Sequence, residues 1–246
     1  MKHPKWQLLL GISLLALSII FYFIHFAIFR DAHHIFIYLI GDIAFVFIEV
    51  LLVTLIIHQV LAIREKRLLL EKLNMVIGSF FSEGGKDLLK IFAGFDPQAE
   101  RIRQNLIVTD GWTTGEFITM SKNLKQYRHD IDISRNSLTG LRQLLVGKRE
   151  FLLHLLENQN LLEHDTFTAL LMAVFHLTEE LASRKDVTTL AVEDQKHIAN
   201  DMKRAYSLLI AEWLDYMRYL KENYPYLFSF AMRTNPFDSD ATPEIK

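Results

Sequence analysis

Two long apolar stretches at the start of the chain constrain its fold more than any other feature of the sequence. Residues 8–29 are apolar or nearly so, and residues 35–57 are apolar apart from two carboxylates and a few small or hydroxyl side chains. At about 1.5 Å of rise per residue, a helix over either stretch crosses a hydrocarbon core roughly 30 Å thick. The sequence therefore predicts a transmembrane hairpin over residues 1–63, with helices at about 7–29 and 34–62.

The first stretch has some features of a secretory signal, but we interpret it as an uncleaved membrane helix. Lys2 and Lys5 precede it, and Ala16-Leu17-Ser18 has the small-x-small spacing of a cleavage site. That triplet lies inside the apolar stretch, whereas a cleaved signal has a shorter apolar core followed by a polar segment. We therefore expect the stretch to remain as the first span.

The distribution of basic residues predicts the orientation of this hairpin. Two lysines precede the first helix and three basic residues follow the second (Arg64, Lys66 and Arg67), whereas the link at residues 30–34 has a single Arg. The positive-inside rule then places both ends in the cytoplasm and the link outside. We expect a two-pass protein of the cell membrane with both termini cytoplasmic.

The segment after the second span carries no helix stop signal. Leu69, Leu73, Val76 and Phe80 follow at helical spacing, so residues 64–83 are expected to continue the second span as a helical stalk. Glycine commonly ends helices, and Gly84-Gly85 is expected to end this one.

The remainder of the chain carries helical patterns and no convincing run of alternating strand residues. Thr113-x-x-Glu116 is a capping box, which predicts the start of a helix. Seven apolar residues spaced by three and four predict the buried face of a long helix. They are Ile198, Met202, Ala205, Leu209, Trp213, Tyr216 and Leu220. We predict an all-α protein with a cytoplasmic helical bundle over residues 84–233 and a disordered tail over 234–246.

Composition excludes several classes of function. The 246 residues include no cysteine, which excludes disulfides, thiolate metal sites and cysteine nucleophiles. The net charge is -2 without a long basic run, so no nucleic-acid partner is expected. The usual hydrolase, zinc-protease and dinucleotide-binding motifs are missing. We expect no cofactor, and we expect that the protein is not an enzyme.

Two carboxylates within the second span are the main candidates for function. Asp42 and Glu49 are seven residues apart and therefore share one face of a helix. An antiparallel hairpin would place Tyr22 beside Asp42 and Ser13 near Glu49, so that Tyr22 could donate a hydrogen bond to Asp42. His58 and His25 would flank the carboxylates at the two ends of the span. Ionisable groups at this depth are rare and costly, and they commonly mark a function.

Three interpretations of these carboxylates remain open. In a homo-oligomer they would line a proton or cation path, or they would act as protonated interhelical hydrogen-bond donors that fix the assembly. In the third interpretation they face a cation on a partner membrane protein.

A metal site in the soluble part is a weaker alternative. Histidine and carboxylate residues occur at helical spacing in His154-x-x-Glu157, in His176-x-x-Glu179, and in Asp194-x-x-His197 followed by Asp201. Bundle di-iron sites use Glu-x-x-His pairs and further glutamates, whereas two of these pairs have the reverse order and the third has Asp in place of Glu. Solvated helix faces explain the residues more simply, and the alternative ligand set is His176, Glu179, His197 and Asp201.

The sequence thus predicts a homo-oligomeric membrane protein that contacts lipid through its hairpin, with Asp42 and Glu49 as candidates for an ion or proton path. The alternative is a membrane-anchored scaffold or sensor whose helical bundle binds a membrane or cytoplasmic protein. A metal-dependent enzyme is the third class that we considered. Architecture alone does not distinguish these functions.

Overall fold

The computed structural model describes residues 4–126, 130–158, 161 and 164–244 of the chain. The protein is 82% helical and these residues contain no strand, which confirms the predicted all-α class. The chain divides into two compact units, Met1–Lys66 and Arg67–Lys246. Lys2, one of the two lysines ahead of the first apolar stretch, lies outside the described residues.

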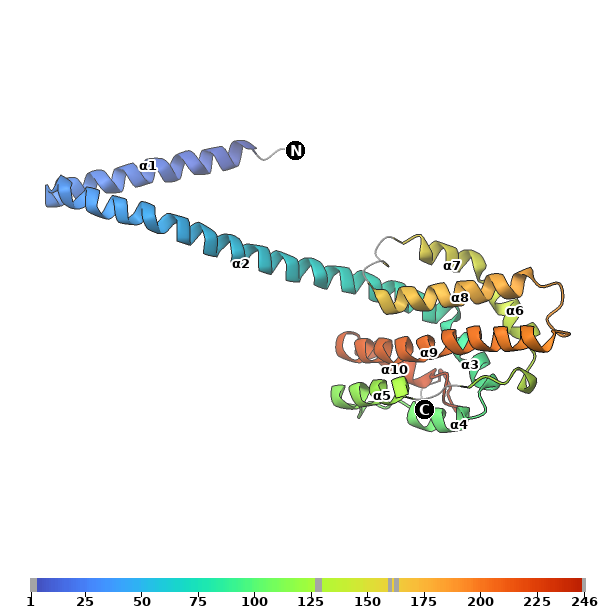
Figure 1. Ribbon diagram of the computed structural model, residues 1–246. Helices are drawn as coiled ribbons and strands as arrows, with labels where there is room; N and C mark the ends of the chain where they lie inside the picture. Colours follow the sequence, from blue (N-terminus) through green and yellow to red (C-terminus); the bar gives the residue numbers. More distant parts are fainter. Residues whose placement is uncertain (1–3, 127–129, 159–160, 162–163, 245–246) are drawn as a thin grey trace. The chain divides into compact units, whose positions relative to one another are not determined.

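Figure 1 shows the helices in their order along the chain. The elements are α1 (Pro4–Phe29), α2 (Ala32–Phe80), the π-helical turn η1 (Phe81–Gly85), α3 (Lys86–Phe95), α4 (Ala99–Asn105), α5 (Thr114–Gln126), the 3-10 turn η2 (Ile133–Arg135), α6 (Leu138–Gly147), α7 (Arg149–Leu156), α8 (Asp165–Ser183), α9 (Val192–Asn223) and α10 (Pro225–Arg233).

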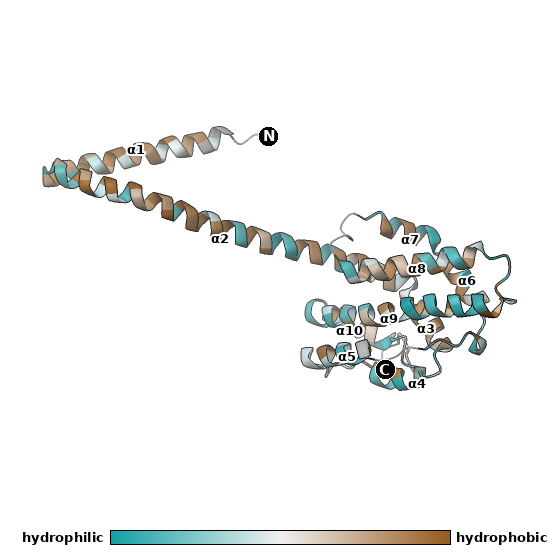
Figure 2. Cartoon of the chain, viewed as in Figure 1, coloured by the Kyte–Doolittle hydropathy of each residue, from teal (hydrophilic) through white to brown (hydrophobic). Residues whose placement is uncertain are grey.

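The first unit contains α1 and the part of α2 up to Lys66. Both helices contain a segment that is long and apolar enough to cross a membrane by length and composition. Figure 2 shows hydrophobic residues along α1 and along the first half of α2. Most large apolar side chains here are exposed, and none of the described residues of this unit belongs to a buried core.

A two-residue link, Arg30-Asp31, joins α1 to α2. Arg30 adopts a left-handed backbone conformation with φ of 51°, which ends α1, and its amide donates to the carbonyl of Phe26 at 2.8 Å. The Asp31 carboxylate then accepts hydrogen bonds from the amides of His33 and His34 at 3.0 and 3.2 Å. These are the contacts of a helix N-cap, so Asp31 begins α2 immediately after α1 ends.

The end of α2 belongs to the second unit and contributes to its core. Leu73, Ile77 and Phe80 are buried there, so the segment that we expected to be a stalk is packed against other helices over its second half. Gly84-Gly85 does not end the helix. Gly85 has right-handed helical dihedrals within η1, and α3 follows directly.

Close packing explains the glycine at position 85. A Cβ atom on Gly85 would lie 2.8 Å from the Phe81 ring and 2.9 Å from the Phe80 ring. Real Cβ contacts are never so short, and both rings are buried. The glycine pair predicts the end of a helix. In the structure, Gly85 instead allows two aromatic rings to pack against the backbone of a continuing helix.

The long helix α9 forms the centre of the second unit. Six of the seven residues in its predicted apolar stripe are buried and Tyr216 is half-buried, which confirms the prediction. Helices α3, α5, α8 and α10 all pack against α9. Buried residues recur at helical spacing along α9 from Ile198 to Leu220, so several helices can pack along it.

Side chains cap the N-termini of α5 and α8, and at α5 the cap is the predicted one. The Thr113 amide donates to the Glu116 carboxylate at 2.6 Å, and the Glu116 amide donates to Thr113 Oγ1 at 3.3 Å. These two bonds are the predicted capping box. At α8 the N-cap is His164, whose Nδ1 accepts from the Phe167 amide at 3.2 Å.

The segment after α10 is packed on the second unit, where we expected a disordered tail over residues 234–246. Asn235 is buried and donates to the carbonyl of Leu106 at 2.8 Å. Phe237 is buried against Trp213, with ring centroids 5.0 Å apart. Residues 245–246 lie outside the described part of the chain.

The two adjacent glycines of η1 provide a matched test of this packing. Gly85→Ala should lower the free energy of unfolding by about 1–3 kcal/mol, because the added methyl group overpacks two buried rings. Gly84→Ala should leave it unchanged or raise it by up to about 1 kcal/mol, because alanine is the better helix former and its Cβ would meet Lys148 Cγ at an ordinary 3.7 Å. Thermal unfolding of the full chain in detergent measures both effects. Equal stability of the two variants would contradict the packing role of Gly85.

Candidate functional site

Two carboxylates in the apolar part of α2 have no partner among the described residues. The side chains of Asp42 and Glu49 are exposed, and neither makes a hydrogen bond or ion pair to any described residue. Ile35 precedes Asp42 by seven residues, so Ile35, Asp42 and Glu49 share one face of the helix. Ile35 lines a cavity between α1 and α2, which identifies the side of α2 on which the carboxylates lie.

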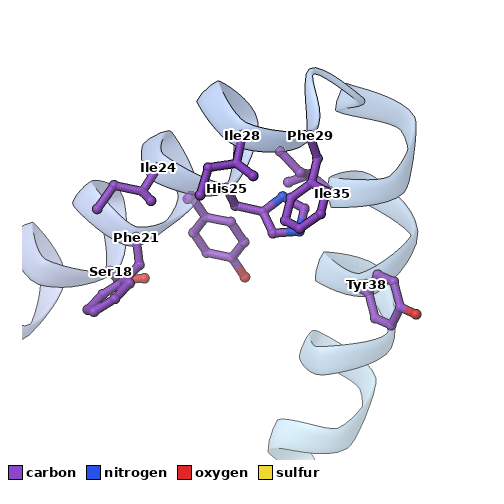
Figure 3. Close-up of a pocket in the computed structure, with 9 residues that line it drawn as sticks. Ser18, Phe21, Ile24, His25, Ile28, Phe29, Ile35 and Tyr38 are labelled. Atoms are coloured by element: carbon purple, nitrogen blue, oxygen red, sulfur yellow. The ribbon is translucent and has the colours of Figure 1, made fainter.

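That cavity has a volume of about 440 Å³ and lies near the turn of the first unit, as Figure 3 shows. Ser18, Tyr22 and His25 of α1 line it and are spaced by four and three residues, so they form a polar stripe on one face of α1. The His25 ring stacks on the His34 ring with centroids 6.2 Å apart. His25 Nδ1 is buried and makes no hydrogen bond.

The predicted residues of the spans are brought together only in part. Tyr22 and His25 share the cavity, but Tyr22 makes no hydrogen bond to Asp42. Ser13, expected near Glu49, donates to the carbonyl of Leu10 in its own helix. His58 follows Glu49 by nine residues, about two and a half helical turns, and so lies on the opposite face of α2. The carboxylates therefore share their face with Ile35 and not with His58.

A second group of candidates meets between α8 and α9 in the second unit. His176 and Glu180 are one turn apart on α8, and His197 and Asp201 are one turn apart on α9. Asp201 Oδ2 lies 3.3 Å from His176 Nε2 and 3.4 Å from His197 Nε2. Glu180 approaches the same two nitrogens at 3.9 and 3.6 Å. We refer to these four residues as the His-carboxylate cluster.

Glu180, and not the predicted Glu179, lies beside the two histidines. The Glu179 carboxylate instead accepts a hydrogen bond of 2.6 Å from Arg149 Nε on α7. Adjacent residues on a helix point about 100° apart, so only one of them can face α9. The other three predicted residues, His176, His197 and Asp201, do meet.

Arginine and burial determine the electrostatics of the cluster. Arg184 donates to the Glu180 carboxylate at 2.7 Å and to the Asp194 carboxylate at 2.5 Å. These hydrogen bonds lower the pKa of Glu180 and of Asp194, so both remain ionised near neutral pH. Asp201 is only 5% exposed, and its Oδ2 atom is buried without a hydrogen bond.

A buried carboxylate at Glu212 was given no role by the sequence analysis. Glu212 is 4% exposed and accepts a hydrogen bond from Thr166 Oγ1, which also lies 3.3 Å from His164 Nδ1. Burial raises the pKa of Glu212, which faces a polar cavity of about 360 Å³. The sequence could have predicted the burial of Glu212, because Glu212 follows Ala205 by seven residues and so lies near the predicted apolar stripe of α9.

Two family models match the chain. The one described as "Uncharacterized protein MJ1433, C-terminal helical domain" matches residues 69–233, and the one described as "MJ1433, N-terminal helical domain" matches residues 1–61. The protein named "Uncharacterized protein MJ1433" of Methanocaldococcus jannaschii is 47% identical over 239 residues, which cover 97% of this chain and 96% of that protein. No solved structure matches the chain. The two matched regions meet close to the boundary between the two structural units.

The raised pKa of Glu212 predicts how its replacement affects stability. The folded protein holds the proton more tightly than the unfolded chain does, so the buried charge destabilises the fold above the folded-state pKa, and this cost disappears as the pH falls. Glu212→Gln should therefore raise the melting temperature at pH 7, with a gain that shrinks toward pH 4. Glu193→Gln is the control, because Glu193 is exposed on the same helix and lies 19 residues from Glu212. Thermal unfolding across this pH range measures both, and a gain that is independent of pH would contradict the assignment.

Proposed function

The chain belongs to the MJ1433 family of helical proteins, and we propose that it is a two-span membrane protein that self-associates through its hairpin and carries a helical domain on the cytoplasmic side. The unpartnered carboxylates of α2 are the observation that carries this proposal. The apolar surface of the first unit supports its place in a membrane, and the basic residues that follow it support the orientation.

The apolar surface of the first unit supports a lipid environment. Its large hydrophobic side chains are exposed from Trp6 to Ile63, on both helices. Soluble monomers rarely expose contiguous apolar patches larger than a few hundred Å². Each helix satisfies its own backbone hydrogen bonds, as a segment in hydrocarbon must. Lipid chains therefore cover these side chains.

The carboxylates require a further partner in that environment. A charged group at the bilayer centre is costly, and carboxylates in spans almost always pair or face a bundle interior. Asp42 and Glu49 have no partner within the hairpin, and they lie on the same face as a residue that lines the cavity between α1 and α2. A second hairpin covers this face, and its polar stripe of Ser18, Tyr22 and His25 offers hydrogen-bonding groups to the carboxylates.

The orientation follows from charge. Arg64, Lys66 and Arg67 directly follow the second apolar segment, whereas the link between the helices has one arginine. The positive-inside rule places these basic residues, and the helical domain after them, in the cytoplasm. The link at residues 30–34 then lies outside the cell membrane.

A proton or cation path is a second candidate for the same carboxylates. Asp42 and Glu49 are two turns apart on one face, so an oligomer that turned this face inward would line its axis with carboxylates. His58 does not contribute, because it lies on the opposite face. Asp42→Asn/Glu49→Gln distinguishes an ion path from self-association alone. The amides can still form the hydrogen bonds that hold an oligomer together, but they carry no charge and release no proton.

A membrane-anchored scaffold or sensor is the alternative function. A cavity of about 730 Å³ in the second unit favours it, because aromatic residues of α9 and its C-cap line this cavity. Tyr216, Tyr219 and Tyr224 contribute apolar rings with polar ends, a combination common at protein interfaces. In this case the hairpin is only an anchor.

The mass of the complex in nanodiscs tests self-association. Wild-type protein should form a discrete oligomer, and Asp42→Leu/Glu49→Leu should shift it toward monomer, because each interhelical hydrogen bond in a membrane contributes about 1 kcal/mol. Asp42→Asn/Glu49→Gln should keep the oligomer. The control is Glu65→Leu, which removes a carboxylate of α2 beyond the apolar segment.

Each outcome of this experiment is informative. Monomeric wild-type protein would contradict the proposal and favour the scaffold. An oligomer that survives the leucine substitutions would show that the carboxylates do not hold it together. If the amide variant assembles normally but loses proton or cation flux in vesicles, the path is supported.

Thiol labelling tests the orientation, and the chain suits it because it contains no cysteine. Ala32→Cys, exposed at the first residue of α2 next to the link, should react with a membrane-impermeant maleimide in intact cells. Ser239→Cys, exposed in the second unit, should react only after the membrane is opened. The reverse pattern would contradict the orientation, and equal labelling of both positions in intact cells would contradict the membrane span.

A further inference from the structure

We propose that the His-carboxylate cluster, His176, Glu180, His197 and Asp201, binds one divalent transition-metal ion between α8 and α9. This site lies in the second unit and does not depend on the proposed role of the hairpin.

The residue types and their spacing suit such an ion. Each helix supplies one imidazole and one carboxylate, and in both helices the two residues are four positions apart. Residues at this spacing project from the same face one turn apart, so the two facing helices bring these four side chains together around the two imidazoles. Two imidazoles with two carboxylate oxygens form a donor set for Zn²⁺ or Fe²⁺, whereas Ca²⁺ and Mg²⁺ prefer oxygen alone.

The distances from Asp201 to the two imidazoles suit a shared metal ion. Metal–ligand bonds of about 2.0–2.1 Å imply ligand atoms about 3.3–3.4 Å apart. Asp201 Oδ2 lies 3.3 and 3.4 Å from the two Nε2 atoms, which matches this spacing. One Glu180 oxygen lies 3.9 Å from His176 Nε2 and the other lies 3.6 Å from His197 Nε2. His176, Glu180 and His197 each place one ligand atom within 4.8 Å of the other two.

Asp201 provides independent support. It is 5% exposed, and its Oδ2 atom is buried without a hydrogen bond although it faces both imidazoles. A buried carboxylate oxygen that lacks a hydrogen bond destabilises the fold, because its lost hydration is not replaced. A metal ion at the centre of the cluster would satisfy this oxygen and hold both imidazoles in their observed places.

Residues around the cluster resemble the outer shell of known metal centres. Arg184 donates to Glu180 at 2.7 Å and fixes the orientation of its carboxylate. The imidazoles of His176 and His197 are 48% and 51% exposed, so one side of the cluster is open to solvent. This open side lets an ion enter, and it leaves room for a water molecule or another ligand on the bound ion.

Titration with Zn²⁺ tests the proposal on full-length protein that has been stripped with a chelator in detergent. Calorimetry should show one Zn²⁺ per chain. At free Zn²⁺ a hundred times the Kd, the melting temperature should rise by about 5–10 °C. His176→Ala/His197→Ala should abolish both effects. His154→Ala should change neither, because His154 pairs only with Glu157 on an exposed surface.

Asp201→Asn distinguishes a metal site from a cluster of ion pairs. It should weaken Zn²⁺ binding at least about tenfold, while the melting temperature in chelator changes little, because asparagine has the size of aspartate and its amide still offers hydrogen-bonding groups to the two imidazoles. The proposal is overturned if wild-type protein shows no stoichiometric binding, or if the double variant binds Zn²⁺ as tightly as the wild type. Should the double variant fail to fold, Asp201→Asn and His197→Gln provide the same comparison.

Discussion

Burial of α9 is the constraint on which the second unit depends. Four other helices, α3, α5, α8 and α10, pack against α9, and so does Phe237 after α10. The packing of α8 on α9 also brings together His176, Glu180, His197 and Asp201, which lie beside the buried stripe. The candidate metal site is therefore a product of the same contact that holds the core.

Sequence patterns predicted the elements whose signal is local. The stripe of α9 and the capping box at Thr113 depend only on neighbours within one helix, and the structure contains both. The predicted helix end at Gly84-Gly85 was wrong, because glycine occurs both at helix ends and where side chains pack closely against the backbone. At Gly85 the rings of Phe80 and Phe81, which precede it by one helical turn and are held in the core of the second unit, leave no room for a Cβ atom. The packed segment at Asn235 and Phe237 likewise depends on Leu106 and Trp213, which are distant in sequence.

The candidate sites likewise combine local patterns that the sequence predicts with contacts that only tertiary packing determines. Histidine and carboxylate residues one turn apart could be found in the sequence, but their pairing across two helices could not. Glu179 and Glu180 are adjacent and chemically equivalent, and only the rotation of α8 against α9 and α7 determines which one reaches the histidines. Asp42 and Glu49 could be found because charge in an apolar stretch is conspicuous, yet neither has a partner among the described residues.

The packed segment after α10 has a consequence for the order of events during synthesis. Trp213 lies in the centre of the second unit, and Phe237 covers it. The ribosome must add residue 237 before this part of the core can close, whereas both apolar segments leave the ribosome much earlier. Domains generally fold as units during synthesis, from the N-terminal end. In the membrane arrangement that we propose, insertion of the hairpin into lipid precedes folding of the second unit, which then completes its core while tethered to the membrane.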